Sequence, residues 1–438
     1  MESYDVIVVG GGPAGLGAAV EAKKLGVEKV LILERDIELG GILQQCIHNG
    51  FGVHLFGEEL TGPEYAQRFI NMARDEKIEV LLDTMVISIS GDKVIKAMNS
   101  SGVLYFSAKA IILAMGCRER TRGSLAIAGT RSAGVFTAGT AQRYINIEGY
   151  MVGKNVIVLG AGDIGMIMAR RIVLEGGNVI AVLNRGAIVK GLTRNIVQCL
   201  HHYDIPLLLN HNITKISGRD RVESVTVART DEKKRVIPGT EKQYPCDAIL
   251  LSVGLIPENE LSKSAGVKID RKTSGPYVNE SMETSIPGVF ACGNVVHVHD
   301  VVDFVTEESR RAGASAAHYV LGWSGGEQGD GSGGGLDGES CGESGGVSDA
   351  MDITVSGGLS YCVPHKIRYS AMPEKLDFFM RVEEVYDKAR IVISGGGNEL
   401  ASFKKINLTP GEMIKLNVKK SIFESVGGSI EISLKAGG

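Results

Sequence analysis

Hydrophobic and polar residues follow two alternating periods in the first part of the chain. An apolar run at residues 4–9 precedes the glycines of 10–15, a helical pattern at 16–25 and a second apolar run at 29–34. This order predicts a βαβ unit, in which a glycine turn joins a strand to a helix. The same order recurs about 150 residues later, with its four segments at 155–159, 160–165, 166–175 and 178–184. The pattern therefore predicts two dinucleotide-binding units.

The segments after each unit suggest how the domains are joined. The apolar runs AIILAMG (110–116) and DAILLSVG (247–254) end in glycine, where the chain can cross between domains. Residues 222–243 favour an antiparallel hairpin. Residues 323–350 are rich in Gly, Ser and Glu and predict a flexible linker spanning roughly 25 to 30 Å, so the last domain need not lie against the preceding one. Short alternating runs in 351–438 then predict a small all-β domain.

The predicted fold class is α/β. It has two Rossmann-like (βαβ, three-layer) dinucleotide-binding domains, the second inserted in the first, and a small C-terminal all-β domain. The predicted boundaries are 1–118 with 277–322 for the first domain, 150–256 for the second, 119–149 and 257–276 for the connecting segments, 323–350 for the linker and 351–438 for the β-rich domain.

Charge and composition narrow the classes of partner. The 438 residues carry a formal net charge of −4 without a long basic run, which argues against nucleic-acid and anionic-membrane binding. No segment approaches the roughly 20 apolar residues of a membrane span, and the first residues lack a positively charged leader. Seven scattered cysteines without a CxxC pair favour a reducing, cytoplasmic location.

The two glycine loops carry the clearest chemistry. In Gly10-x-Gly12-x-x-Gly15 the glycines allow a tight turn and close approach of backbone amides to a pyrophosphate, and Glu34 at the end of the next strand can accept ribose hydroxyls. The second loop is Gly160-x-Gly162-x-x-Gly165, and the position matching Glu34 is Asn184, followed by Arg185. Either Arg185 pairs with the 2′-phosphate of NADP(H), or Asn184 bonds the 2′-hydroxyl of NAD(H) and Arg185 is solvated.

Three motifs carry a resemblance to a known family. GGGPAG near the start, AMGCRERTRG (114–123) and ETSIPGVFACGN (283–294) resemble the pyridine nucleotide-disulphide oxidoreductase superfamily over residues 1–322. GGILQQCIHNGFG (40–52), GVFTAGTAQ (134–142) and LSVGLIPENEL (251–261) resemble a subgroup that accompanies glycerol-3-phosphate dehydrogenase-like subunits and is related to the FAD/NAD subunits of sarcosine oxidase, opine oxidase and hydrogen cyanide synthase.

The resemblance implies FAD in the first domain and NAD(H) or NADP(H) in the second. The superfamily motif ends in Gly-Asp where this chain has Gly293-Asn294, and an amide can still hydrogen-bond a ribityl hydroxyl. The helix expected at 306–321 would point its N-terminus at the flavin. The residues predicted to contact FAD are Gly10, Gly12, Pro13, Ala14, Gly15, Glu34, Arg35, Gly41, Ala114, Gly116, Gly293 and Asn294, and those predicted to contact the nicotinamide coenzyme are Gly160, Gly162, Asp163, Ile164, Gly165, Asn184, Arg185 and Gly254.

Thiol chemistry within the chain is disfavoured. Disulfide-reducing members of the superfamily carry CxxxxC after the Gly-Gly pair, where this chain has Leu43 and His48 with Cys46 between them. Cys46 is either a buried structural residue or a thiol facing the flavin. His48 and His299 are candidates to move protons or contact the flavin ring, or else polar core histidines.

Metal binding is not predicted. His297, His299 and Asp300 offer two imidazoles and a carboxylate without a clear fourth ligand, which suits a hydrogen-bonded loop beside the flavin better than a metal centre.

These observations predict an FAD-dependent NAD(P)H oxidoreductase in which the central hydride transfer needs no acid or base. The resemblance implies an electron-transfer subunit, in an oligomer or hetero-complex, whose redox partner is a glycerol-3-phosphate or amine dehydrogenase-like flavoprotein, with an iron–sulfur subunit. Three alternatives stay open, namely a stand-alone NAD(P)H oxidase or diaphorase, a thioredoxin-reductase-like disulfide reductase, and a nucleotide-binding assembly or sensor subunit.

Overall fold

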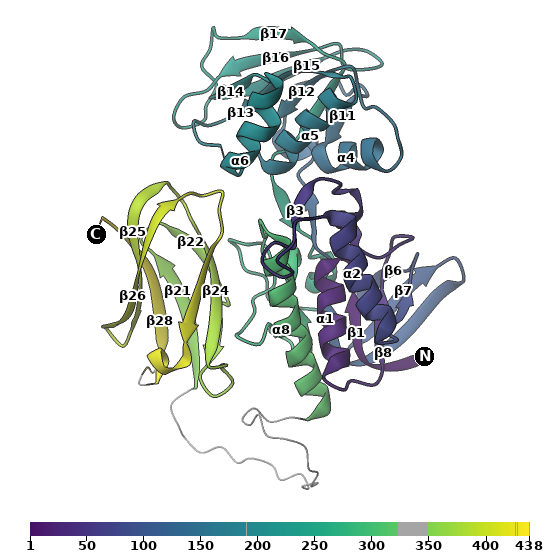
Figure 1. Ribbon diagram of the computed structural model, residues 1–438, viewed down its shortest axis with the longest axis vertical. Coiled ribbons are helices and arrows are strands. Elements are labelled where there is room, and N and C mark those ends of the chain that lie inside the picture. Colours follow the sequence, from purple (N-terminus) through teal and green to yellow (C-terminus); the bar gives the residue numbers. More distant parts are fainter. Residues whose placement is uncertain (190, 323–348, 425, 427, 438) are drawn as a thin grey trace.

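The computed structural model describes residues 1–189, 191–322, 349–424, 426 and 428–437. Most of the predicted linker, residues 323–348, lies outside the described residues. Three bodies are visible in Figure 1, with the second dinucleotide domain at the top, the first below it, and the C-terminal β domain beside the first, next to helix α8.

The first domain is built on a seven-stranded sheet in which β1, β2, β5, β8 and β20 run parallel. Strand β20, far along the chain, pairs with β8 and completes this sheet. Strands β8 and β20 are buried at their carboxyl ends, as expected for a parallel sheet covered by helices. The strands are β1 (Glu2–Val9), β2 (Val30–Leu33), β5 (Glu79–Leu81), β6 (Met85–Ile89), β7 (Val94–Asn99), β8 (Gly102–Leu113) and β20 (Val289–Ala291).

Three helices cover this sheet and position its loops. Helices α1 (Pro13–Lys24) and α8 (Val302–Leu321) pack side by side, and Gly313 of α8 approaches Ala18 of α1 so closely that a Cβ would lie 2.2 Å from the Ala18 carbonyl oxygen. The third is α2 (Gly62–Asp75), which follows the short antiparallel pair β3 (Asn49–Phe51) and β4 (Leu60–Thr61). Helix α8 begins four residues before the predicted start at Thr306, because its first turn contains the β-branched Val302 and Val305, which favour an extended interpretation of the sequence.

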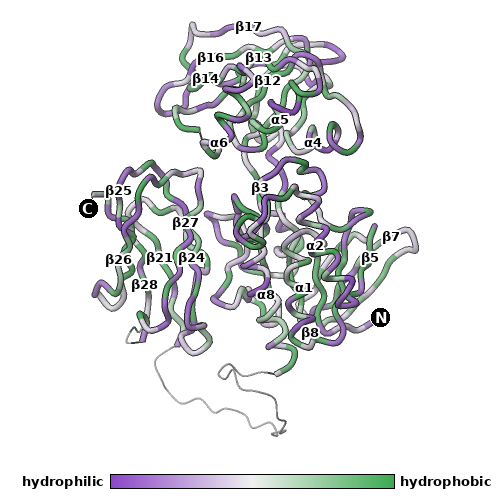
Figure 2. The backbone as a smooth tube through the Cα atoms, viewed as in Figure 1, coloured by the Kyte–Doolittle hydropathy of each residue, from purple (hydrophilic) through white to green (hydrophobic). Residues whose placement is uncertain are grey.

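The second domain repeats this plan with a five-stranded parallel sheet. Apolar residues on both faces of the sheet form two separate clusters, and Figure 2 shows the inner strands as hydrophobic and the edge strand β17 as largely hydrophilic. The parallel strands are β11 (Val135–Thr137), β12 (Asn155–Leu159), β13 (Asn178–Asn184), β14 (Leu207–Leu209) and β18 (Ala248–Leu251), and the longer helices are α4 (Ala138–Asn146) and α5 (Asp163–Leu174).

An antiparallel excursion and short connecting elements complete the second domain. Strands β15, β16 and β17 pair antiparallel in the region of the predicted hairpin, and β9 pairs with β19 between the two domains. The bounds are β9 (Cys117–Glu119), β10 (Ala128–Gly129), β15 (His211–Ser217), β16 (Ser224–Arg229), β17 (Lys242–Pro245), β19 (Leu255–Pro257), α3 (Arg122–Leu125), α6 (Thr193–Asn195) and α7 (Glu260–Ser264).

The C-terminal domain consists of two small sheets around a core of its own. It also contacts the first domain, because Val363 is buried within the core of that domain. The first sheet contains β21 (Ala350–Ser356), β23 (Lys366–Arg368), β25 (Tyr386–Gly395), β26 (Asn398–Leu408) and β28 (Ser429–Ala436), and the second contains β22 (Leu359–Val363), β24 (Lys375–Val382) and β27 (Ile414–Lys419).

No helix among the described residues is both long and apolar enough to cross a membrane.

Candidate active site

The first glycine loop connects β1 to α1 and leaves no room for side chains. Gly10 has φ +105°, and a Cβ there would lie 2.5 Å from the carbonyl oxygen of Ala114. A Cβ on Gly15 would lie 1.8 Å from the Gly10 carbonyl oxygen. Gly12 has only the Cα of Gly41 nearby, at 4.0 Å from its ideal Cβ position. Tight packing on the inner side and open space at Gly12 suit a loop whose backbone amides approach a bound pyrophosphate.

The start of α1 has backbone donors for such a ligand. Its N-cap is Gly12, no side chain caps the helix, and Pro13 occupies its first turn together with Ala14. By contrast, Thr61 and Glu64 form a full capping box at the start of α2. The first N–H groups of a helix need acceptors, and a pyrophosphate supplies them while the helix dipole favours its charge. The residues present therefore fit the dinucleotide that the sequence predicts.

Glu34 lies at the carboxyl end of β2, beside the glycine loop. Its side chain is buried, and its two carboxylate oxygens accept hydrogen bonds from the backbone N–H of Gly11 at 2.6 Å and of Asp36 at 2.8 Å. The structure thus brings the predicted ribose-binding carboxylate to the loop, while the neighbouring Arg35 is exposed.

The third motif meets the first loop directly. A Cβ on Gly293 would lie 2.7 Å from the Cβ of Ala14, so this turn packs against the start of α1. The Asn294 side chain accepts a hydrogen bond from the His299 backbone N–H at 2.9 Å, and its amide group donates to the Cys117 sulfur at 3.6 Å. Gly116 next to Cys117 has φ +71°. Sequence segments near 10, 116 and 293 are therefore neighbours at the carboxyl ends of β1, β8 and β20.

The second glycine loop has the same construction. Gly160 has φ +104°, and a Cβ there would lie 2.0 Å from the Ser252 carbonyl oxygen. The Ser252 hydroxyl accepts a hydrogen bond from Gly165 N–H at 3.1 Å. Helix α5 begins after Gly162 without a side-chain cap, which leaves donors for a second pyrophosphate. Gly254, at the end of the neighbouring segment, has φ +104°.

Two predicted residues of this loop are engaged within the protein. The Asp163 carboxylate accepts hydrogen bonds from Leu192 N–H at 2.8 Å and from the Asn195 amide at 2.6 Å, which tie it to the segment around α6. The following Ile164 is partly buried in the apolar core of the second domain. Asp163 therefore stabilises the start of α5.

Asn184 and Arg185 are also committed to protein partners. The Asn184 amide donates to the carbonyls of Gly186 and Ile188, at 2.8 and 2.9 Å. The Arg185 guanidinium donates twice to the Lys234 carbonyl, at 3.1 and 3.0 Å. An Arg185 contact with a 2′-phosphate requires the guanidinium to leave this carbonyl or to share its remaining donors.

The segment after Gly41 bridges the two dinucleotide domains. The Gln45 amide, in the 3-10 turn at Gly41–Gln45, donates to Gly139 O at 2.8 Å and Gln142 Oε1 at 2.9 Å, both on α4. A Cβ on Gly50 would lie 3.0 Å from an Arg194 guanidinium nitrogen. Sequence reasoning missed this bridge, because glutamines and a lone arginine give no signal of a contact about 100 residues away in the chain.

His48 belongs to this bridging segment. Its ring lies 5.1 Å from the Phe51 ring, and Nδ1 is 3.1 Å from the Asn49 carbonyl oxygen. Burial lowers the pKa of His48, and Arg194 and Arg170 of the second domain lower it further. The imidazole is therefore neutral at pH 7, between the two predicted coenzyme sites.

Cys46 is held as a thiol. Burial raises its pKa to about 12, and its sulfur donates to the Ile42 carbonyl oxygen at 3.2 Å. Every cysteine in the described part of the chain is free, and Cys117 also has its pKa raised by burial, to about 11. Both environments suppress the thiolate that disulfide chemistry requires.

His297 and His299 lie beside α8 and the C-terminal domain. Their rings are 4.2 Å apart, and both face Glu308 of α8 and Phe379 of β24. Asp300, grouped with them by sequence, instead pairs with Arg381 of β24. Sequence reasoning missed Glu308, because an acidic residue within a helix is usually solvated.

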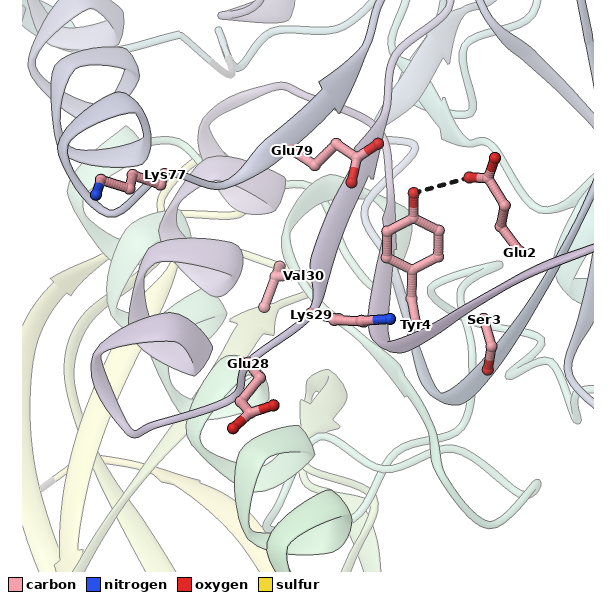
Figure 3. A pocket seen from close by; sticks show the side chains of 8 residues that line it. All are labelled: Glu2, Ser3, Tyr4, Glu28, Lys29, Val30, Lys77 and Glu79. Atoms are coloured by element: carbon pink, nitrogen blue, oxygen red, sulfur yellow. Dashed lines mark hydrogen bonds between the residues drawn. The ribbon is translucent and has the colours of Figure 1, made fainter.

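A hollow of about 450 Å³ lies elsewhere, at the amino ends of β1, β2 and β5. Figure 3 shows the Tyr4 hydroxyl bonded to Glu2, with Glu79 across the hollow and Lys29 and Lys77 along its wall. Ligands of parallel α/β sheets bind at the carboxyl ends of the strands, so this hollow is separate from the dinucleotide sites.

The chain belongs to the pyridine nucleotide-disulphide oxidoreductase family, which it matches over residues 4–318. Membership confirms the predicted fold class, the class of FAD-dependent NAD(P)H oxidoreductase and the two cofactors. A solved structure, the thioredoxin reductase of T. acidophilum, is 25% identical with a TM-score of 0.58, over 74% of this chain and 99% of that chain.

Three curated relatives illustrate the range of activities. The NAD(P)H coenzyme A polysulfide/persulfide reductase of Pyrococcus horikoshii is 27% identical over 68% of this chain and 64% of its own length. The NADH oxidase of Methanocaldococcus jannaschii is 28% identical over 69% and 64%. An opine oxidase subunit of Agrobacterium tumefaciens is 25% identical over 66% and 61%. The chain thus spans less than two thirds of the length of these relatives.

Proposed function

We propose that this protein transfers a hydride between NAD(P)H and FAD and exchanges the electrons with an acceptor or donor outside this chain. The observation that carries the proposal is the pairing of two uncapped glycine loops with buried, protonated cysteines. Gly12 and Gly162 open two dinucleotide sites, whereas burial keeps the pKa of Cys46 near 12. An internal disulfide relay needs a thiolate at neutral pH, so the electrons leave by another route.

The residues of this chain bind and orient the reactants. The backbone donors at the starts of α1 and α5 hold the two pyrophosphates, and the Glu34 carboxylate accepts hydroxyls of one ribose. FAD supplies the ring that accepts the hydride when it is bound. Asn294 and the start of α8 lie where the family motif places the flavin, and the helix N-terminus favours negative charge there. Hydride transfer itself needs no protein acid or base.

We also propose that the protein is the electron-transfer subunit of a larger enzyme. Its partner would be a glycerol-3-phosphate or amine dehydrogenase-like flavoprotein, with an iron–sulfur subunit. The similarity to a relative that is itself named as one subunit of an opine oxidase supports such an assembly. So do the exposed apolar side chains of Tyr144, Ile147, Tyr150 and Met151 at the end of α4, near the bridge between the domains.

An anaerobic titration of the purified full chain tests the hydride transfer. We expect a yellow protein whose visible flavin absorbance is bleached by about one equivalent of NADH or NADPH. A protein that stays colourless after reconstitution with FAD, or whose flavin is reduced only by dithionite, contradicts the proposal. Identification of the proteins that co-elute with the untagged native chain tests the complex, and elution as a single species with no flavoprotein partner contradicts it.

A stand-alone NAD(P)H oxidase is the second candidate, favoured by the similarity to a relative named NADH oxidase. Oxygen consumption separates the two. An oxidase turns over with oxygen about as fast as NAD(P)H reduces its flavin, whereas a protein that serves a partner reoxidises in air far more slowly than it is reduced.

A further inference from the structure

Two histidines and a glutamate form a buried cluster that the hydride transfer does not use. His297 and His299 follow the short turn at Gly293–Val295, and Glu308 lies in the second turn of α8. The side chains of all three are at most 1% exposed. The ligand atoms of the three residues lie within 4.8 Å of one another.

Hydrogen bonds within the protein satisfy only part of this cluster. Glu308 Oε1 accepts from the Gly293 backbone N–H at 2.7 Å, and Oε2 is 2.8 Å from His297 Nε2. His299 Nε2 is 3.4 Å from Glu308 Oε1 and has no hydrogen-bond partner within the described part of the chain, and the Nδ1 atoms of both histidines also have none. Each buried polar atom without a partner costs about 1 to 3 kcal/mol.

The donor atoms are spaced as ligands of one small cation. Two imidazole nitrogens and one carboxylate oxygen are the ligands that Zn²⁺ takes in three-residue protein sites. Bonds of 2.0 to 2.1 Å in a tetrahedron place neighbouring ligand atoms about 3.3 Å apart. The separations of 2.8 Å and 3.4 Å between the histidine nitrogens and the carboxylate oxygens need only small adjustments to reach this value. Burial lowers the pKa of His297 to about 4, so this imidazole is unprotonated at pH 7, as a ligand must be.

The surroundings provide a route for the ion and a position for water. A hollow of about 120 Å³ between α8 and β24 is lined by Glu308 and Phe379 together with Glu307, Arg311 and Asp377. Besides Glu308, two of these lining groups are acidic, Arg311 is basic, and Arg381 nearby is neutralised by Asp300. Phe379 closes the other side, with its ring 5.7 and 5.4 Å from the two imidazoles.

We propose that His297, His299 and Glu308 bind one divalent transition-metal ion, with Zn²⁺ as the ion that best suits this ligand set and a water from the hollow as the fourth ligand. The site is structural, because its ligands are buried beneath β24 and lie outside the path between the two coenzymes. It joins the flavin-motif turn at Gly293 to α8 and thereby fixes the geometry of that turn. The proposal does not rest on the proposed hydride transfer.

Metal titration of the full-length protein tests the site. After chelator treatment, Co²⁺ added as a spectroscopic probe should bind at about one equivalent per chain and give the intense visible bands of a four-coordinate nitrogen and oxygen site. Zn²⁺ should displace Co²⁺ and raise the melting temperature. His299→Gln and Glu308→Gln should each lower the affinity for Co²⁺ at least about tenfold, whereas the exposed control His202→Gln should leave it unchanged.

Two results overturn the proposal. One is wild-type protein that binds Co²⁺ without visible bands or at well below one equivalent, because the cluster is then a hydrogen-bonded group without a metal. The other is Co²⁺ binding that is the same in the His299 and Glu308 variants as in wild type, because the ion then lies elsewhere. The wild-type titration decides the question even if a variant fails to fold.

Discussion

Replacing Gly160 with alanine tests whether the second glycine loop positions the nicotinamide coenzyme. Gly160 ends the turn after β12 with φ +104°, and an added Cβ would lie 2.0 Å from the Ser252 carbonyl oxygen. Ordinary van der Waals contact begins at 3.4 Å, so the loop or the segment after β18 must move by more than about 1 Å. The displaced atoms are the ones that carry the coenzyme pyrophosphate.

The magnitude follows from separating backbone strain from displacement. A non-glycine residue at positive φ costs about 1 to 2 kcal/mol wherever it stands. Gly176 has φ +81° with nothing within 4 Å of its Cβ position, so Gly176→Ala bears the strain without the collision. A misplacement of about 1 Å between reacting groups lowers a rate roughly 100-fold. We therefore expect Gly160→Ala to slow flavin reduction about 100-fold and Gly176→Ala to leave it within a factor of about three.

Anaerobic stopped-flow reduction by NADH, followed at the visible flavin band, measures this effect. FAD content should be unchanged in both variants, because Gly160 lies outside the first domain, whose sheet and glycine loop remain intact. Reduction of Gly160→Ala at the wild-type rate would refute the assignment of the coenzyme to this loop. Equal slowing in both variants would show that strain, and not loop position, controls the rate.

Three further predictions test individual side chains. Cys46→Ser should keep diaphorase activity with an artificial dye within about twofold of wild type, because burial holds the thiol protonated, and a loss above about tenfold contradicts this. Arg185→Gln should change KM for NADH less than about twofold, since the guanidinium is bound to the Lys234 carbonyl, whereas a selective rise in KM for NADPH would indicate a 2′-phosphate contact. Burial lowers the pKa of His365 below its unfolded value of 6.5 while its Nδ1 accepts from Val278 N–H, so the unfolded chain binds the proton first and stability falls as pH drops below 6.5. Thermal melts of wild type and His365→Asn from pH 7.5 to 5 check this, and parallel pH profiles would count against His365.

Local patterns were sufficient to predict the parts of the fold that local physics determines. The run at 155–159 and the run at 178–184 coincide with β12 and β13, because buried parallel strands require continuous apolar residues. Helices α1 and α5 begin three residues earlier than the predicted 16 and 166, since Pro13 and Asp163 already belong to the first helical turn. The glycine loops were predicted for the same reason, because positive φ at Gly10 and Gly160 leaves the sequence little choice.

Contacts between distant segments could not be predicted in this way. Glu308 faces His297 only because α8 packs against α1 and orients that side of the helix toward the flavin-motif turn. Gln45 meets Gln142 only because the two dinucleotide domains are adjacent. Neither pair leaves a periodic or compositional mark in one sequence, since any surface helix carries acids and amides of the same kind.

The C-terminal domain is the clearest example of this limit, and its position changes how the flavin site is understood. A glycine-rich linker sets how far a domain can travel and says nothing about where it docks. Asp300 accepts from Arg381 and, at 2.7 Å, from the Met413 backbone N–H, and Arg381 also donates to the Val298 carbonyl at 3.0 Å. The segment from 296 to 301 joins the flavin motif to the first residue of α8, so holding it from one side restrains both. A perturbation of β24 therefore reaches the flavin-motif turn through Asp300 and Phe379 while both glycine loops remain intact.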